Sequence, residues 1–106
     1  MLFESLHHSA EQGELILVDG GYCRYHLRND GQITIYEILV LPDRQRQGIG
    51  TAMLDQLRAL NPASLYASCP TDLPANTWYQ HRGFTLEHTD TTRTGRELNR
   101  WRLALS

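Results

Sequence analysis

The sequence predicts an α/β sandwich of the α+β type, in which helices flank a mixed, largely antiparallel sheet. Three observations lead to this fold class. Alternating segments joined by glycine-containing turns come first, an amphipathic helix pattern follows a long apolar segment in the middle, and a second helix precedes two closing strands. The chain has 106 residues, enough for a single domain spanning 1–106 with a thin core.

The composition is that of an ordinary globular protein, with 41% hydrophobic and 21% charged residues. Its net charge of −2 provides no overall basic field for nucleic acid or anionic membranes. No apolar stretch is long enough to span a bilayer, and the first residues lack the pattern of a secretory signal. Cys23 and Cys69 have neither metal-site nor disulfide spacing. We therefore expect a cytoplasmic protein with no metal, membrane or nucleic-acid partner.

The first elements are a short helix within residues 1–13 and strands at 14–18 and 22–28. An Asp-Gly-Gly turn joins the two strands. The second strand alternates, with Cys23, Tyr25 and Leu27 on one face and Arg24, His26 and Arg28 on the other.

A third strand is predicted at residues 32–41, after the turn Asn29-Asp30-Gly31. It is apolar on both faces apart from one acid, Glu37, which is typical of a central strand covered on two sides. Pro42 ends it.

The second half begins with a helix at residues 47–60, whose apolar stripe is formed by Ile49, Met53, Leu57 and Leu60. A short strand follows at 65–68.

A second helix starts near Pro74 and ends at Gly83, with Ala75, Trp78 and Tyr79 on one face. Strands at 84–88 and 97–105 then close the sheet around a polar hairpin.

The segment that joins the third strand to the first helix has the features of a phosphate-binding loop. Gly48 and Gly50 lie in the first turn of the helix, where backbone N–H groups have no internal partner and the helix dipole attracts anions. Arg44 and Arg46 add positive charge. Two glycines at a helix start also serve close helix–strand packing, so this signal alone is weak.

Two motifs in this chain resemble the GNAT acyltransferase superfamily. The segment Gln45-Arg46-Gln47-Gly48-Ile49-Gly50 resembles its motif A, and the stretch from Ala75 to Phe84 resembles its motif B, A-x-x-x-Y-x-x-x-G-F. The motifs occur in the expected order with a strand between them. The resemblance implies the GNAT fold and, because few residues precede the first strand, reduced opening helices on the acceptor side.

The resemblance also implies a binding site for acetyl-CoA. The pyrophosphate is expected on the amides of residues 46–51, and the pantetheine along residues 38–40. Asn76 is included because it lies near the position where the family often has Asn, although the matching residue here is Asp72. The complete predicted cofactor set is Ile38, Leu39, Val40, Gln45, Arg46, Gln47, Gly48, Ile49, Gly50, Thr51, Asn76 and Tyr79.

The implied reaction is direct attack of a primary amine on the thioester. Tyr79 matches the motif B tyrosine, and a phenol is protonated at neutral pH and suited to protonate the departing thiolate. Glu37 is the candidate base, because a carboxylate in an apolar strand is costly unless something satisfies it. With a two-residue hairpin turn, however, Arg24 lies opposite Glu37, so an ordinary cross-strand ion pair is an equal alternative.

Other interpretations stay open. A reduced acceptor side is compatible with a CoA-binding module that lacks catalysis, or with a homodimer in which a second copy completes the site. An acetyltransferase acting on aminoacyl-tRNA requires a local basic patch, for which the candidates are Arg93, Arg96, Arg100 and Arg102. An acyl-Cys69 mechanism lacks an identifiable histidine partner, so Cys69 is interpreted as a buried thiol.

Overall fold

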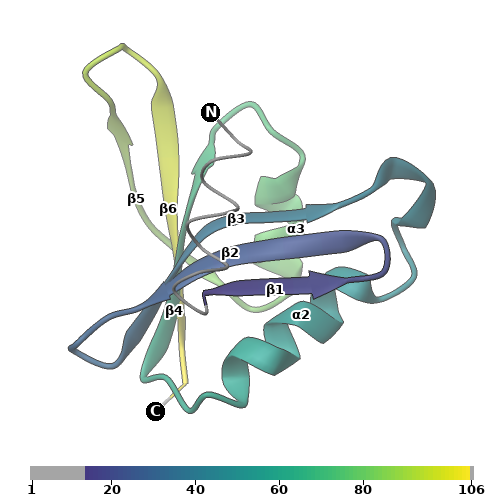
Figure 1. Ribbon diagram of the computed structural model, residues 1–106. Coiled ribbons are helices and arrows are strands. Elements are labelled where there is room, and N and C mark those ends of the chain that lie inside the picture. The colour runs from purple at the N-terminus through teal and green to yellow at the C-terminus, as the bar shows by residue number, and fades with distance from the viewer. Residues whose placement is uncertain (1–13, 106) are drawn as a thin grey trace.

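The computed structural model describes residues 14–105 of the chain (Figure 1). The helix expected within residues 1–13 lies outside the described residues. Within these residues, one six-stranded sheet carries two α-helices and one short 3-10 helix. The strands are β1 (Leu15–Val18), β2 (Gly21–Leu27), β3 (Gln32–Val40), β4 (Ser64–Pro70), β5 (Thr85–Thr91) and β6 (Glu97–Ala104), and the helices are η1 (Pro42–Arg44), α2 (Ile49–Arg58) and α3 (Ala75–His81).

The strands lie in the order β1-β2-β3-β4-β6-β5. All neighbouring pairs are antiparallel except β3 and β4. A parallel pair needs a crossover connection, which α2 provides. The structure therefore confirms the predicted α+β fold with a mixed, largely antiparallel sheet.

The hairpin between β2 and β3 contains two irregularities that compensate each other. Its turn has three residues rather than two, because Arg28 N–H donates to Gln32 O at 2.8 Å. This loop shifts the pairing by one residue, so that Leu27 pairs with Ile33. A β-bulge further along β3 leaves Tyr36 without a partner residue and shifts the register back.

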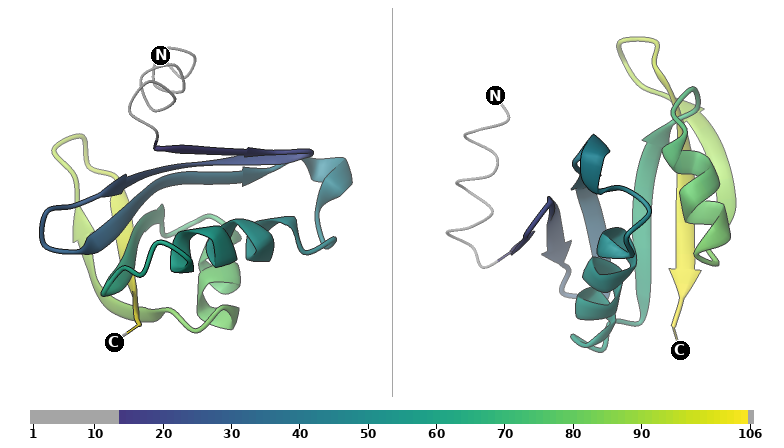
Figure 2. Two further views of the ribbon diagram at one scale, coloured as in Figure 1. Left: turned by 60° about the horizontal axis from the view of Figure 1, so that its bottom comes forward. Right: turned by 90° about the vertical axis from the view of Figure 1, so that its right-hand side faces the viewer.

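Both helices pack against the same face of the sheet, as Figure 2 shows. The core lies between them and the strands. Its buried residues are Ile16, Cys23, Tyr25, Ile33, Ile35, Met53, Leu54, Leu57, Leu65, Ala67, Cys69, Tyr79, Phe84 and Trp101. Leu27 and Leu60, which continue the apolar patterns of β2 and of the predicted helix, are both exposed. Leu60 lies beyond the end of α2. Leu54, which belongs to α2, is buried in the core.

The opposite face of the sheet is covered by no helix among the described residues. We call it the open face; on β1–β3 it carries Leu17, Tyr22, Arg24, Tyr36 and Leu39. Tyr36 is 55% exposed and Leu39 is 38% exposed. The prediction that β3 is covered on two sides is therefore wrong for its C-terminal half, which contains Tyr36 and Leu39.

Several element boundaries differ from the predicted ones. The strand predicted at 65–68 extends over Ser64–Pro70, because it pairs with β6 along its whole length. The helix predicted at 47–60 is shorter at both ends. No helix within residues 14–105 is long and apolar enough to cross a membrane.

Candidate active site

The neighbouring strands β3 and β4 separate halfway along their length. Their ladder runs from the Gln32–Ser64 pair to the Ile35–Ala67 pair, whereas β4 stays paired with β6 as far as Pro70. The bulge at Tyr36 lies where they separate, and Figure 1 shows the strands diverging beyond it. The edge of residues 37–40 that faces β4 therefore has no partner strand in the described part of the chain, which suits an extended ligand with amide groups.

The loop between β3 and α2 presents a row of free backbone donors. Gly48 is the N-cap of α2, and no side chain caps the helix. No hydrogen bond within residues 14–105 uses the backbone N–H groups of residues 45–51. Arg46 and Gly48 adopt left-handed backbone conformations, with φ of 66° and 80°. Free amides at a helix N-terminus bind anions, so this loop fits a phosphate-bearing ligand.

The two glycines of the loop have different roles. A Cβ added at Gly48 meets no atom within 4 Å, so space is open for a ligand there. A Cβ added at Gly50 lies 2.9 Å from Cζ2 of Trp78. Gly50 therefore allows α3 to approach α2, whereas Gly48 allows the turn and leaves the amides accessible.

The polar side chains of the loop differ in the hydrogen bonds and ion pairs that they form. Arg44 donates to Asp19 Oδ2 at 3.0 Å, and this hydrogen bond and positive charge lower the pKa of Asp19. Arg44 also donates to Gln47 Oε1 at 3.3 Å. Gln45 donates to Val40 O at 3.2 Å and closes the loop. Arg46 is exposed and, among the described residues, has no hydrogen bond or ion pair. Of the two predicted cations, Arg46 is thus the one without an acidic partner.

Tyr79 lies on α3 in the aromatic part of the core, packed against Trp78, Phe84 and Trp101. Although the residue is only 5% exposed, its hydroxyl oxygen is not fully enclosed by the protein. This hydroxyl has no hydrogen-bond partner in the described part of the chain. Burial raises the pKa of Tyr79 above its ordinary value, so the phenol keeps its proton at neutral pH. This combination is suitable for a proton donor.

Asn76, which was included in the predicted cofactor set, uses both ends of its amide within the protein. Its Nδ2 donates to the carbonyl oxygens of Pro70 and Leu73, both at 2.8 Å. Its Oδ1 accepts from Asn99 Nδ2 at 3.0 Å and Trp101 Nε1 at 2.9 Å. The side chain thus connects β4, α3 and β6 beside Tyr79, and a role in holding the cofactor directly stays a prediction.

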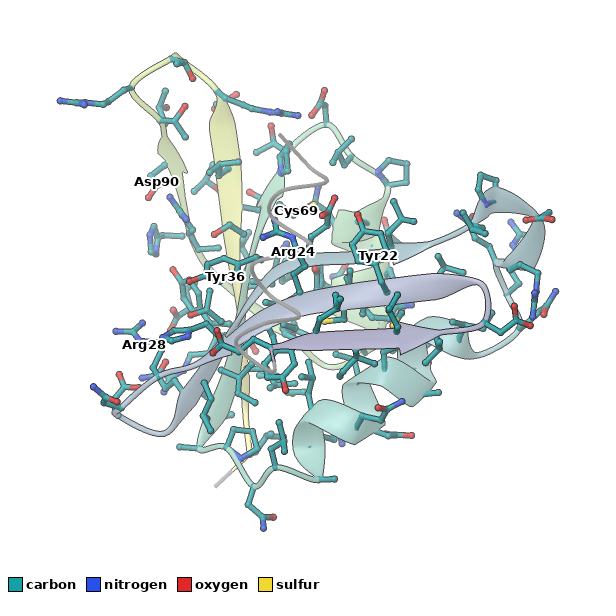
Figure 3. All side chains as sticks on the ribbon, viewed as in Figure 1. Tyr22, Arg24, Arg28, Tyr36, Cys69 and Asp90 are labelled. Carbon is teal, nitrogen blue, oxygen red and sulfur yellow. The ribbon has the colours of Figure 1, made fainter. Side chains whose placement is uncertain are left out.

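Glu37 pairs with Arg24, as the cross-strand alternative predicted. Arg24 Nε lies 3.4 Å from Glu37 Oε1, and the Arg24 guanidinium lies 5.7 Å from the centre of the Tyr36 ring. Tyr22 rises from β2 on the same side (Figure 3), and its enclosed hydroxyl has no hydrogen-bond partner among the described residues. Burial, followed by the neighbouring Glu37, raises the pKa of Tyr22 to about 12.

The open face is hollowed on the hairpin side of the bulge. A depression of about 480 Å³ is lined by His26, Arg28, Asn29, Asp30, Thr34 and Tyr36. Tyr36 is thus shared between this depression and the point where β3 and β4 separate. The lining is polar and contains the Arg28–Asp30 ion pair, at 3.5 Å.

On the β4 side of the separation, Arg100 is held firmly. Its Nε and Nη2 contact the Asp90 carboxylate at about 3 Å, and its Nη1 donates to Ser68 Oγ. The hydrogen bond from Arg100 lowers the pKa of Asp90. Arg102 pairs with Glu87 at 3.6 Å. Two of the four arginines considered for a basic patch therefore have acidic partners.

Arg82, which the sequence did not single out, lies beside the loop. Its Nη1 donates to Thr51 Oγ1 at 3.1 Å. The two residues are 31 positions apart, and only the packing of α3 on α2 brings them together. Local sequence patterns contain no signal for such a contact.

Among the described residues, potential metal ligands are not grouped and both cysteines are buried. Within residues 14–105 no three His, Cys, Asp or Glu residues are grouped to hold a metal ion. Cys23 and Cys69 are free and buried, and burial raises the pKa of both thiols, to about 12 for Cys23.

Comparisons with known proteins identify the family of this chain. Residues 4–86 match the family model for the acetyltransferase (GNAT) domain. The comparison with curated proteins finds no match. Among solved structures, a GNAT-family protein of Desulfovibrio desulfuricans is 26% identical, with a TM-score of 0.72 over 82% of this chain and 62% of its own.

Two further structures extend the comparison. The ribosomal-protein-S18-alanine N-acetyltransferase of Escherichia coli is 26% identical, with a TM-score of 0.67 over 82% of this chain and 62% of its own. A Bacillus anthracis protein solved with acetyl coenzyme A is 16% identical, with a TM-score of 0.72 over 82% of this chain and 57% of its own; at this identity the likeness concerns the fold alone. This chain thus spans about three fifths of each of these structures. Because the family model covers most of the chain, the protein belongs to the GNAT acetyltransferase family.

Proposed function

We propose that this protein transfers the acetyl group of acetyl-CoA to a primary amine. The observation that carries the proposal is the juxtaposition of the free amides at residues 45–51 with the separation of β3 and β4, in a chain of the GNAT family. The amides suit the pyrophosphate, and the free edge of residues 37–40 suits the amide groups of pantetheine. The thioester then lies near the separation, between Glu37 and Tyr79.

The amine attacks the thioester carbonyl carbon directly, forming a C–N bond, and the C–S bond breaks. Tyr79, which its raised pKa keeps protonated at neutral pH, donates its proton to the sulfur as the C–S bond breaks. Glu37 accepts the proton lost by the amine, directly or through one water molecule. Glu37 then releases its proton to solvent and solvent returns a proton to Tyr79, so the products are the acetylamide and CoA.

The acceptor is proposed to approach over the open face. The depression lined by Tyr36 and Thr34 extends from the bulge towards the β2–β3 turn, so the amine's substituent has space there. Its polar lining favours a polar acceptor over an aliphatic one. A mass-spectrometric screen of amine pools with labelled acetyl-CoA identifies the acceptor, and the complete absence of acetylated product contradicts catalysis.

Binding of the co-substrate has a matched test in two glycines. Gly48 and Gly95 both have positive φ, 80° and 86°, and both have open space around an added Cβ. Gly48→Glu introduces backbone strain and negative charge at the loop, whereas Gly95→Glu introduces the same strain in the β5–β6 turn. We expect acetyl-CoA to raise the melting temperature of the wild type and of Gly95→Glu but not of Gly48→Glu. No shift in the wild type at millimolar acetyl-CoA contradicts the proposal.

The second candidate function is a CoA-binding module without catalysis. The ion pair with Arg24 favours it, because Glu37 already has a structural role that explains its presence. Binding of CoA without turnover of any amine, together with no effect of Tyr79→Phe, supports this alternative. The acetylation of aminoacyl-tRNA gains less support, since Arg100 and Arg102 are paired with acids.

A homodimer is also proposed. Leu17, 72% exposed on the edge strand β1, and Leu39 lie on the open face and offer an apolar contact. Light scattering after size exclusion tests this proposal: a monomer that still turns over substrate contradicts it, and Leu17→Glu is expected to dissociate a dimer.

A further inference from the structure

Arg82 is an exposed cation beside the phosphate-binding loop that has no carboxylate partner within residues 14–105. It follows α3 as its C-cap, and its backbone N–H is bonded to the carbonyl oxygens of Trp78 and Tyr79. Its guanidinium reaches Thr51 Oγ1, in the first turn of α2, at 3.1 Å. This single contact engages one of the five N–H donors of the guanidinium and leaves the others available.

The other charges around the loop make Arg82 distinctive. Arg44 is held by Asp19 and turned towards Gln47, so its charge is already compensated. Arg46 belongs to the loop itself. Arg82, in contrast, approaches from another element and is fixed from both ends, by the α3 backbone and by Thr51.

CoA carries two kinds of phosphate: the pyrophosphate in its chain and a monoester on the ribose 3′ oxygen. The free amides of residues 45–51 supply donors for the pyrophosphate. The monoester carries between one and two negative charges at neutral pH and needs donors of its own. A guanidinium is well suited to this, because its planar N–H groups bind phosphate oxygens in pairs.

We propose that Arg82 binds the 3′-phosphate of CoA and that the protein thereby distinguishes CoA from dephospho-CoA. The proposal rests on the proposed function, since it assumes CoA in the loop. The geometry favours the 3′-phosphate over the pyrophosphate, because the side chain of Thr51 is turned towards α3, whereas the free amides lie at the N-terminal end of α2. Arg82 thus lies next to the row of amides rather than within it.

The test compares two ligands that differ by one phosphate group. Dissociation constants for CoA and dephospho-CoA are measured by calorimetry for the wild type, Arg82→Gln and Arg58→Gln. Arg58, an exposed cation in the last turn of α2, is the matched control for the loss of one positive charge. Melting temperatures of the ligand-free variants confirm that each one is folded.

We expect the wild type to bind CoA about tenfold more tightly than dephospho-CoA, the size expected of a charge-assisted hydrogen bond. Arg82→Gln should lose about tenfold in affinity for CoA and nothing for dephospho-CoA, and Arg58→Gln should behave as the wild type. Arg82→Lys keeps the charge without the paired donors and should fall between.

Two results overturn the inference. Equal losses for both ligands in Arg82→Gln assign the residue to the pyrophosphate, and no loss for either ligand removes it from the binding site. A different result, failure of the wild type to bind either ligand, contradicts the proposed function itself. The two failures are therefore distinguishable.

Discussion

Arg24 and Glu37 face each other across β2 and β3, with Arg24 Nε 3.4 Å from Glu37 Oε1, next to the point where β3 and β4 separate. Their side chains are 21% and 33% exposed. A pair with this exposure contributes on the order of 1 kcal/mol or less to folding. The position at the separation, rather than stability, is therefore the feature of this pair that bears on function.

Substitution of either residue separates the two roles of Glu37. If Glu37 accepts the proton of the amine, Glu37→Gln lowers kcat by about 10²- to 10⁴-fold. Arg24→Gln keeps the carboxylate, and most of the activity should remain. Steady-state kinetics of both variants and the wild type provide the measurement. Equal and small effects of both substitutions contradict the role as base and leave only the ion pair.

Tyr79→Phe removes the proposed acid and little else. The hydroxyl has no partner in the described part of the chain, so the melting temperature should change little. The expected loss is in kcat, by about 10²- to 10⁴-fold, with an unchanged dissociation constant for acetyl-CoA. Calorimetry and kinetics on the same preparation measure both. Weaker binding without loss of kcat would instead assign Tyr79 to positioning of the cofactor.

The pairing of Arg24 with Glu37 illustrates how far the sequence determines the site. The prediction assumed a two-residue turn and a regular ladder, and both assumptions are wrong. The extra turn residue and the bulge at Tyr36 each shift the register by one, in opposite directions, so the predicted pair still forms. The bulge has no signature in the sequence, because it depends on how β3 leaves β4 rather than on local preferences.

Local patterns predicted the elements and the two motifs, since turn residues and apolar periodicity are properties of neighbouring residues. They did not predict contacts between elements. The Arg82–Thr51 contact, the four hydrogen bonds of Asn76 and the exposure of Leu60 all depend on the positions of α2 and α3. The open face of β3 was missed for the same reason: an apolar strand does not indicate on which side the helices pack.

Gly50 and Trp78 provide a test of the packing that positions Tyr79. A Cβ at Gly50 would lie 2.9 Å from Trp78 Cζ2, closer than two carbon atoms can pack. Gly50→Ala should therefore destabilise the fold by about 1–3 kcal/mol, as overpacking of a core does. Trp78→Leu removes the clash, so the double variant should be more stable than the sum of the single changes predicts. Denaturant unfolding measures the free energy of unfolding of the wild type, the two single variants and the double variant. Additive changes in this free energy would contradict a direct clash.

Alkaline pH should destabilise the protein, because burial raises the pKa of Cys23 to about 12 and of Tyr22 to about 12. In the unfolded chain these groups release their protons near their ordinary values of 9.0 and 10.0. Between those values and about 12 the folded state binds more protons than the unfolded state, so the free energy of unfolding falls as pH rises. Below pH 9 neither group causes this dependence.

Cys23→Ala isolates one contribution to that fall. Each group that titrates only in the unfolded state contributes a slope of about 1.4 kcal/mol per pH unit. Urea unfolding between pH 9 and 11, in the presence of a reductant, should therefore show a slope smaller by about this amount in Cys23→Ala. The control is Ser64→Ala, which removes a buried hydroxyl that does not titrate and has no hydrogen-bond partner within residues 14–105. Ser64→Ala should shift the stability at every pH without changing the slope, and an unchanged slope in Cys23→Ala would show that the thiol titrates equally in both states.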